Sequence, residues 1–394
     1  MSSSKTVALL VGMIVFGSLN TLVRKAQMVT CSSSSFPADP SFSGVCTEPN
    51  EEPFNKPWIG NLFMFVGEMM LFVVVMRERN PSISAASFAN GSAGPRNLPW
   101  YYFGIPACLD VVGSGLSGVS MLFISASVWQ MLRGSMIVYT AILSVVFLNR
   151  RLQAQHVTGL LIASLGLSFV GVSAYLDSEN SASLLLQQAV HLGTDSTTLV
   201  IFGIGLTVLS QFCSAIQVVV EEYLLKTDGT EYACPSPARV VAYEGIWGFT
   251  VMLIVLVLMQ VIPGLDHGSY ENSIDSFEKM SNSGTLLLLV IIYCVSIALF
   301  NHCGMAVSKN LSSLHRTLID SLRAIVVWGT QLVIYYASGS TTYGLAWTSY
   351  SWIQLAGFFL LVLGTLMYNE VVNIYRVEGP EQLIETQPIM QDRL

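Results

Sequence analysis

Arg133 is the side chain in this sequence best suited to bind a solute. It lies about two helical turns inside an apolar stretch, 126–148, and no acidic residue lies within four positions of it. A charge at the centre of a membrane span costs about 2.5–3.5 kcal/mol, so this guanidinium must face a partner on another helix or a wet cavity. Gln130, three residues earlier, adds an amide to the fork of guanidinium donors. This combination suits a phosphate or a carboxylate, and we predict that Arg133 and Gln130 contact an anionic solute.

Acidic residues in other apolar stretches are the candidate partners of Arg133. They are Asp110, Glu68 and Glu222. Asp110 and Glu222 could also carry protons, because burial favours the neutral form of a carboxyl group. A plain ion pair is an equally good interpretation of both residues.

Further polar side chains interrupt the apolar stretches. Asn20 and Gln217 place comparable amides inside two of them, and Asp320 lies three residues before Arg323 on one helical face, where the two could pair. We include Asn20, Gln217 and Asp320 among the predicted solute contacts. Glu221, Arg323 and Glu370 lie near a boundary or a local partner, so snorkelling or a structural ion pair is the favoured interpretation for them.

The composition indicates that these side chains lie in a membrane protein. Hydrophobic residues make up 52% of the 394 residues and charged residues 11%, with a mean hydropathy of +0.59. A soluble protein carries about 25% charged residues. Stretches of about 18–25 apolar residues fit the bilayer core, and their length and lack of alternation exclude a barrel. Ten such spans are predicted: 6–23, 58–76, 99–121, 126–148, 154–176, 198–225, 238–262, 284–307, 313–337 and 351–372.

The basic residues predict the orientation of the spans. With the N-terminus in the cytosol, twelve Lys and Arg residues, among them Arg316, fall on the cytosolic side and four on the other. This asymmetry follows the positive-inside rule and predicts that both termini are cytosolic. No small-residue cleavage site follows the first span, so we expect it to be retained. The long polar loops 24–57, 177–197 and 263–283 then lie on the non-cytosolic side and are expected to be mobile.

The sequence predicts no cofactor. Its seven cysteines show neither a CxxC pair nor metal-ligand spacing. Cys31 and Cys46 share one polar loop and could form a disulfide in an oxidising compartment, or remain free thiols. No GxxxxGK[ST] loop for ATP is present, and no basic face suggests nucleic acid.

The ten predicted spans show signs of an internal repeat. The fifth span contains Gly159 and Gly166, and the tenth contains Gly357 and Gly364 with the same spacing. Because each half has an odd number of spans, the second half must be inverted relative to the first. Inverted repeats place a binding site near the midplane that opens to alternate sides.

A second alignment joins the spans around Arg133 to those around Asp320. When Gly118 is set on Gly304, Ser127 falls on Ser313, and two further pairs coincide. These pairs are Leu132 with Leu318 and Ser135 with Ser321.

Several segments together resemble the drug/metabolite transporter superfamily, and within it the F subgroup of the nucleotide-sugar-transporter-like solute carrier 35 family. They are "SASVWQMLRGSMIVYTAILSVVFLNRRL" (125–152), "QVVVEEYLLK" (217–226), "YEGIWGF" (243–249), "VSKNLSSLHRTLIDSLRAIVVW" (307–328) and "GTLMYNEVV" (364–372). The resemblance implies the ten-helix EamA transporter fold and a lysosomal or Golgi membrane. The subgroup's intramembrane polar positions correspond here to Asp110, Gln130 to Gly134, Glu221 and Glu222, Glu244, and Asp320 to Arg323.

We therefore predict an all-α integral membrane protein built as an inverted 5+5 repeat. The first repeat is 1–176, a non-cytosolic linker is 177–197, the second repeat is 198–372, and a cytosolic tail is 373–394. The expected function is exchange or secondary-active transport of a small polar, anionic, nucleotide-sugar-like or metabolite solute by alternating access. The lipid bilayer and the solute are the expected partners, with a homodimer as an open alternative.

Two other functions fit parts of the sequence. A non-transporting membrane scaffold or adaptor would use the intramembrane charges for structure alone. An intramembrane serine protease would use Ser117 of "GLSG" (115–118) with His302, but the number of spans and the repeat disfavour it. An aspartyl protease using Asp110 and Asp320 would need a GxGD motif, which the sequence lacks.

Overall fold

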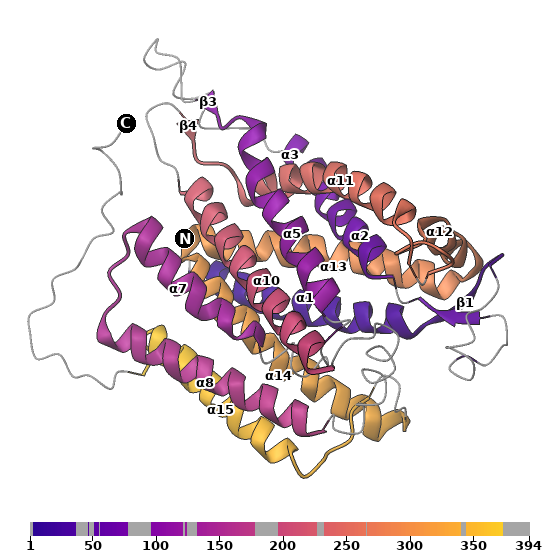
Figure 1. Ribbon diagram of the computed structural model, residues 1–394. Coiled ribbons are helices and arrows are strands. Elements are labelled where there is room, and N and C mark those ends of the chain that lie inside the picture. Colours follow the sequence, from indigo (N-terminus) through magenta and orange to yellow (C-terminus); the bar gives the residue numbers. More distant parts are fainter. Residues whose placement is uncertain are drawn as a thin grey trace, which may run out of the picture.

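The computed structural model describes residues 3–36, 46, 51–54, 56–77, 96–120, 123, 132–177, 196–226, 232–264, 266–339 and 344–372. Helices dominate this part of the chain (Figure 1), and nine helical segments within it are long and apolar enough to cross a membrane. In chain order they are α1 (Ser3–Val29), α2 with α3 (Pro57–Met70, Phe72–Arg77), η2 with α5 (Trp100–Phe103, Gly104–Ser120), α8 (Ala154–Asp177), α10 (Ser196–Leu225), α11 (Pro237–Val261), α13 (Gly284–Asn310), α14 (Ser313–Ser338) and α15 (Ser351–Tyr368). The prediction of an all-α membrane protein is confirmed.

The remaining predicted span, 126–148, is the fourth in chain order and corresponds to the shorter helix α7 (Ser135–Leu148). Its 14 residues rise about 21 Å at 1.5 Å per residue, which is less than the roughly 30 Å of a hydrocarbon core. Residues 124–131 lie outside the described part of the chain. The number of ten spans therefore stays a prediction.

Apolar side chains cover the outside of the helices. On α1, Val7, Val11 and Val15 follow one another at a spacing of four residues, and each is 52–54% exposed. A row of exposed valines on one helical face is unfavourable in water but suits contact with lipid. The same pattern continues with exposed valines and leucines on α8 and α11.

The helix contacts of the two halves mirror each other. Each helix of the first half has a counterpart five spans later, and when every helix is replaced by its counterpart the same contacts are found. α1 packs on α13 and α14, and the corresponding α10 packs on α5 and α7. α2 packs on α13, and the corresponding α11 packs on α5. A helix also contacts its own counterpart in three cases: α2 with α11, α7 with α14 and α8 with α15. This is the contact pattern expected of an inverted repeat.

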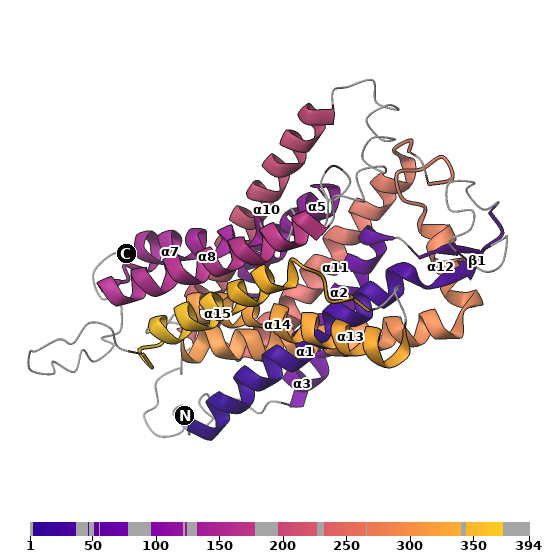
Figure 2. The ribbon, with the colours of Figure 1, turned by 90° about the horizontal axis from the view of Figure 1, so that it is seen from below.

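The interface between α8 and α15 depends on the glycines that suggested the repeat. Figures 1 and 2 both show these helices side by side. A Cβ on Gly364 would lie 2.6 Å from the carbonyl oxygen of Gly159, and one on Gly357 would lie 2.7 Å from that of Gly166. The two glycine pairs therefore face each other in antiparallel order, and no larger residue fits this backbone contact.

A matching local hydrogen bond occurs in both halves. The Ser135 hydroxyl donates to the Leu132 carbonyl oxygen at 2.7 Å, and the Ser321 hydroxyl donates to the Leu318 carbonyl oxygen at 2.6 Å. These residues are the ones that the sequence alignment placed in equivalent positions. Ser127 of the same alignment lies outside the described residues, as do the tail 373–394 and residues 178–195 of the predicted linker.

A folded cap covers the end of the bundle opposite the start of α1 and the end of α15 (Figure 1). It contains α12 (Ser273–Asn282) and the antiparallel strands β1 (Cys31–Ser33) and β2 (Glu51–Pro53). A disulfide joins Cys31 to Cys46. The expectation that loops 24–57 and 263–283 are mobile is wrong for their described residues, because helix capping and strand pairing order these polar segments. At the other end, β3 (Arg96–Asn97) pairs in parallel with β4 (Tyr232–Ala233).

Candidate functional site

Helix α14 carries a charged stripe through the packed helices. Arg316, Asp320 and Arg323 are spaced by four and three residues, so their side chains lie on one face of the helix. Arg316 is buried, with 9% of its surface exposed. Arg316 was counted with the cytosolic-side charges at the start of the predicted span 313–337, and the structure shows it buried between helices, three residues after α14 begins at Ser313.

Arg133, Asp320 and Arg323 form one group, which we call the dibasic site. Arg133 Nη2 lies 3.7 Å from Asp320 Oδ2, and Arg323 Nε lies 3.2 Å from Asp320 Oδ1. The Arg323 guanidinium also lies over the ring of Phe300 on α13, 5.1 Å from its centroid. Two guanidinium groups thus share one carboxylate, and the dibasic site has a formal charge of +1.

The dibasic site corrects the predicted partners of Arg133. The candidates were Asp110, Glu68 and Glu222, whereas the structure pairs Arg133 with Asp320. The local pairing of Asp320 with Arg323 is present as predicted. Gln130, the other predicted member of this site, lies outside the described residues.

Four acidic side chains from four helices interact with Arg316, the first residue of this stripe. We call Glu68, Asp110, Glu221 and Glu244 the carboxylate cluster, since all four interact electrostatically with one another and with Arg316.

The carboxylate cluster is held by a few direct contacts. Arg316 forms an ion pair with Glu221, and Gln217 donates from Nε2 to Glu221 Oε1 at 2.8 Å. Asn301 of α13 donates from Nδ2 to Glu68 Oε1 at 2.6 Å. Of the predicted contacts, Glu68, Asp110 and Gln217 are therefore gathered here, away from Arg133. The snorkelling interpretation of Glu221 is wrong, because this residue is fully buried.

Sequence reasoning missed Arg316 and Asn301 as members of an intramembrane site. The signal that could have revealed Arg316 is its spacing from Asp320 and Arg323, which fits one helical face. Asn301 gives no comparable signal, because a single amide near the middle of a helix does not indicate which neighbour it meets.

Glu222 contacts other residues than the predicted partner Arg133. Glu222 Oε2 accepts hydrogen bonds from the Ser313 backbone nitrogen at 2.7 Å and from its hydroxyl at 2.5 Å. Glu222 Oε1 pairs with Arg150 and, at 2.8 Å, with Lys226. Glu222 therefore caps the start of α14 and joins it to the ends of α7 and α10. Asn20, a further predicted contact, accepts a hydrogen bond from the Ser296 hydroxyl at 3.4 Å.

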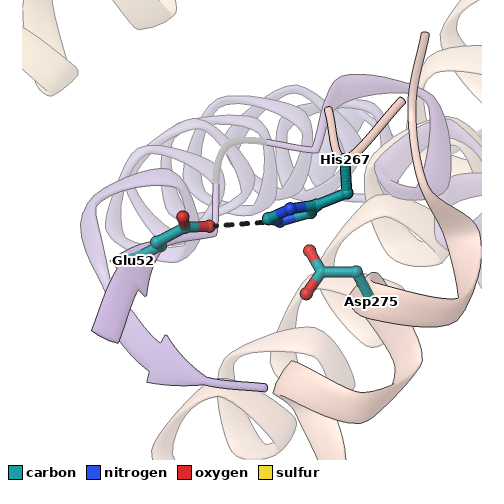
Figure 3. A group of neighbouring side chains, drawn as sticks. All are labelled: Glu52, His267 and Asp275. Atoms are coloured by element: carbon teal, nitrogen blue, oxygen red, sulfur yellow. Dashed lines mark ion pairs between the residues drawn. The ribbon is translucent and has the colours of Figure 1, made fainter. Parts of the chain in front are cut away.

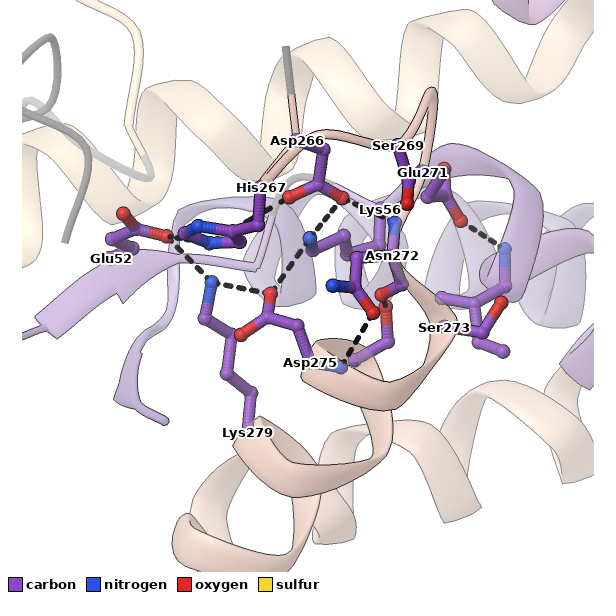
Figure 4. A network of polar contacts seen from close by, with 12 residues as sticks. Glu52, Lys56, Asp266, His267, Ser269, Glu271, Asn272, Ser273, Asp275 and Lys279 are labelled. Carbon is purple, nitrogen blue, oxygen red and sulfur yellow. Dashed lines mark hydrogen bonds and ion pairs between the residues drawn. The ribbon is translucent and has the colours of Figure 1, made fainter. Parts of the chain in front are cut away.

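The cap contains a dense polar network (Figure 4). The ammonium groups of Lys56 and Lys279 lie 2.8 and 2.9 Å from Asp275 Oδ2, and that of Lys279 lies 2.7 Å from Glu52 Oε2. Burial alone would raise the pKa of Asp275, but the contacts with Lys56, Ser34 and Lys279 outweigh it and lower the pKa to about 2.

Glu271 links this network to the transmembrane helices. Its carboxylate accepts hydrogen bonds from the backbone nitrogens of Trp58 at 2.9 Å and Ile59 at 2.7 Å, and so caps the start of α2. Burial nevertheless raises the pKa of Glu271 to about 7.

One group in the cap has the composition of a metal site. The ligand atoms of Glu52, His267 and Asp275 lie within 4.8 Å of one another (Figure 3). The Lys279 ammonium already contacts both acidic residues, and His267 Nε2 lies 3.7 Å from Glu52 Oε2. Because a lysine already supplies the positive charge that a cation would provide, the arrangement fits an ion-pair network better than a metal site.

The chain is similar to several known proteins. The sequence model of the UAA transporter family matches residues 42–371. The human protein "Solute carrier family 35 member F6" is 31% identical over 364 residues, which cover 91% of this chain and 86% of that protein. The Schizosaccharomyces pombe protein "Uncharacterized protein C12G12.12" is 28% identical over 325 residues, which cover 81% of this chain and 88% of that protein. A solved crystal structure aligns with 95% of this chain and 100% of its own at a TM-score of 0.54, and its 13% identity makes this a likeness of fold alone.

Proposed function

This chain belongs to the UAA transporter family, and from that premise we propose that it carries a small anionic solute by alternating access, with the dibasic site as the solute-binding site. The family and its solute carrier relatives make the chain a multi-pass membrane transporter of small solutes. The choice of an anionic solute rests on one observation, which is that two guanidinium groups share a single carboxylate between the helices.

The charge of the dibasic site supports an anionic solute. Asp320 supplies one negative charge to the two guanidinium groups, so the dibasic site has a formal charge of +1, which favours a negatively charged ligand. An arginine fork binds planar oxyanions such as carboxylates and phosphates with two parallel hydrogen bonds. A solute that carries one such group would complete the charge balance of the site.

The accessibility of the dibasic site supports solute entry. The side chain of Arg133 is 36% exposed and that of Asp320 is 23% exposed. Charged side chains between membrane-spanning helices that stay partly exposed favour a water-accessible position, which is the usual setting of a transport site.

The position of the dibasic site supports alternating access. Arg133 precedes α7 and Asp320 lies on α14. These two helices are counterparts in the two halves, and they contact each other. An ion pair between such helices lies close to the axis that relates the two halves. When the halves rock against each other, the Arg133–Asp320 contact lies at their pivot. Since the sequence has no ATP-binding loop, transport would be exchange or ion-driven.

The arrangement of the two ends supports the proposed orientation. The start of α1 and the end of α15 lie at one end of the bundle, and strand β1, which begins with the disulfide-bonded Cys31, lies at the other (Figure 1). We place the termini in the cytosol and the disulfide in the oxidising lumen of a lysosomal or Golgi membrane.

A counterflow screen tests the proposed function. The purified full-length protein would be placed in liposomes and assayed for exchange of radiolabelled nucleotide sugars, nucleotides, amino acids and small peptides. We expect exchange of at least one anionic solute, and we expect Arg133→Gln and Arg323→Gln each to reduce its rate at least tenfold, because each removes half of the guanidinium pair.

Arg77→Gln is the matched control, since Arg77 is an exposed arginine at the end of α3. Its exchange rate should equal that of the wild type. Exchange limited to neutral or cationic solutes, or undiminished in both dibasic-site variants, would rule out the proposed binding site.

A further inference from the structure

The carboxylate cluster has more negative charge than its surroundings can balance. It gathers four carboxyl groups around one guanidinium, that of Arg316. Three of the four, Glu68, Glu221 and Glu244, are at most 5% exposed. Charged groups in a membrane interior are tolerated only when they are paired, so part of the cluster must hold protons or cations.

Close packing of α2 against α11 places two of these acids together. A Cβ on Gly245 would lie 2.6 Å from the Met69 backbone nitrogen and 2.7 Å from Glu68 Cβ. The absence of a side chain at Gly245 therefore lets α11 touch α2 at Glu68. The neighbouring residue Glu244 interacts electrostatically with Glu68, and like charges raise the energy of the doubly ionised pair.

The Glu244 carboxyl group has an unsatisfied atom at this contact. Glu244 Oε1 is buried and forms no hydrogen bond with any other described residue. Glu68, in contrast, is already held by Asn301. A buried carboxylate oxygen without a donor is costly, and a proton bound to the pair removes that cost.

The spacing of the cluster favours a proton over a metal ion or another cation. Among the described residues, the single group of three acidic, histidine or cysteine side chains with ligand atoms within 4.8 Å lies in the cap. Hence no three carboxyl groups of the cluster converge as a cation cage requires. A proton needs only one oxygen, or two that share it.

Charged and titratable groups from every neighbouring helix face the pair of Glu68 and Glu244. Tyr293 of α13 lies near Glu68 and Asp110, and Arg24 of α1 lies 5.6 Å from the Tyr293 ring. Among the described residues, the groups that face the pair, directly or through one neighbour, include Arg24, Asp110, Glu221, Tyr293, Cys294, Arg316 and Asp320.

We propose that Glu68 and Glu244 form a proton-binding site that exchanges its proton during transport and so couples the solute to a proton gradient. The coupling rests on the proposed function, whereas proton binding at the pair does not. The proton moves from water to a carboxylate oxygen of the pair and leaves to water on the other side, with no covalent change.

Helix α14 connects the proton site to the dibasic site. Arg316 pairs with Glu221 and also interacts with Asp320, which lies one turn further along. Loss of a negative charge at Glu68 and Glu244 leaves Arg316 more strongly attracted to Asp320. Asp320 then binds Arg133 less well, so the affinity of the dibasic site for an anion should rise when the proton is bound.

Infrared difference spectroscopy tests proton binding on the purified full-length protein, with the proton as the only ligand. A buried protonated carboxyl group gives a carbonyl stretching band that shifts in heavy water. We expect this band at neutral pH in the wild type, and a loss of intensity in both Glu68→Gln and Glu244→Gln. Glu370→Gln is the control, since the Glu370 side chain is 55% exposed, and its spectrum should match that of the wild type.

The outcomes separate the two proposals. A wild-type spectrum without the band at neutral pH overturns the proton site even if a variant fails to fold. A band that is unchanged in both glutamine variants also overturns it. If the band is lost as expected but the counterflow panel shows no anion exchange, the proton site stands and the proposed function fails. If the counterflow panel shows anion exchange but the carbonyl band is absent, the proposed function stands and the proton site fails.

Discussion

Asp320 is the residue at which binding and release of the solute should compete. It shares its carboxylate between Arg133 and Arg323, so an anion must replace it as their partner. We expect Asp320→Asn to lower the KM for an anionic solute by about tenfold, because the competing charge is removed, and to lower kcat, because the solute leaves more slowly. Initial exchange rates over a range of solute concentrations would measure both. A higher KM in Asp320→Asn would mean that the aspartate helps to bind the solute.

Glu271 should make stability depend on pH. Burial raises its folded-state pKa from 4.5 to about 7, so between these values the folded protein binds a proton that the unfolded chain releases. Its contribution is fully present below about pH 4.5 and is lost as the pH rises through 7, on the order of 3 kcal/mol in all. Thermal unfolding of the detergent-solubilised protein should therefore show a melting temperature that falls from pH 5 to pH 7.5.

Glu271→Gln should flatten this dependence, since an amide does not titrate. Asp275, whose pKa is lowered to about 2, titrates below the window and does not contribute to it. If the melting temperature of Glu271→Gln falls with pH as steeply as that of the wild type, another group causes the pH dependence of stability.

At the level of the helices, Glu222 links three of them. It caps the start of α14 and pairs with Arg150 and Lys226 at the ends of α7 and α10. We expect Glu222→Gln to lower the free energy of unfolding by about 2–3 kcal/mol, because hydrogen bonds to a charged acceptor are lost and Arg150 and Lys226 are left without their partner. The melting temperature should fall by several degrees, while Glu370→Gln should leave it unchanged. Equal melting temperatures would mean that water replaces the Glu222 contacts.

The contact of α8 with α15 allows a matched pair of glycine variants. A Cβ at Gly364 would lie 2.4 Å from the Ala163 backbone nitrogen, whereas a Cβ at Gly205 of α10 would meet nothing within 4 Å. Gly364→Ala should therefore destabilise the protein, since the two helices must separate. Gly205→Ala should be neutral or stabilising by about 0.5–1 kcal/mol, through helix propensity. Similar melting temperatures for the two variants would contradict the observed packing.

For the whole molecule, the sequence predicted what depends on pattern along the chain. Hydropathy located the helices, and the spacing of Gly159 with Gly166 and of Gly357 with Gly364 indicated two related helices that face each other. These features depend on local residue type, which the sequence states directly.

Partner choice between helices could not be predicted in the same way. Arg133 meets Asp320 and not Asp110, because the rotation of each helix about its axis is set by packing with all its neighbours. Arg316 was counted with the cytosolic-side charges because it lies within one turn of the helix start, where hydropathy does not separate buried from exposed charges. The order of the cap depends on contacts between distant segments, such as that of Lys279 with Glu52.

The exposure of the dibasic site to each side of the membrane in turn is the property on which transport depends, and thiol labelling measures it. The five cysteines outside the disulfide would be replaced by alanine, and Ser321→Cys would be introduced next to Asp320. We expect a membrane-impermeant thiol reagent to modify this cysteine from either side of the liposome, and an exchanged anion to slow the reaction from both sides. Modification from one side only, or none from either side, would contradict alternating access at the dibasic site.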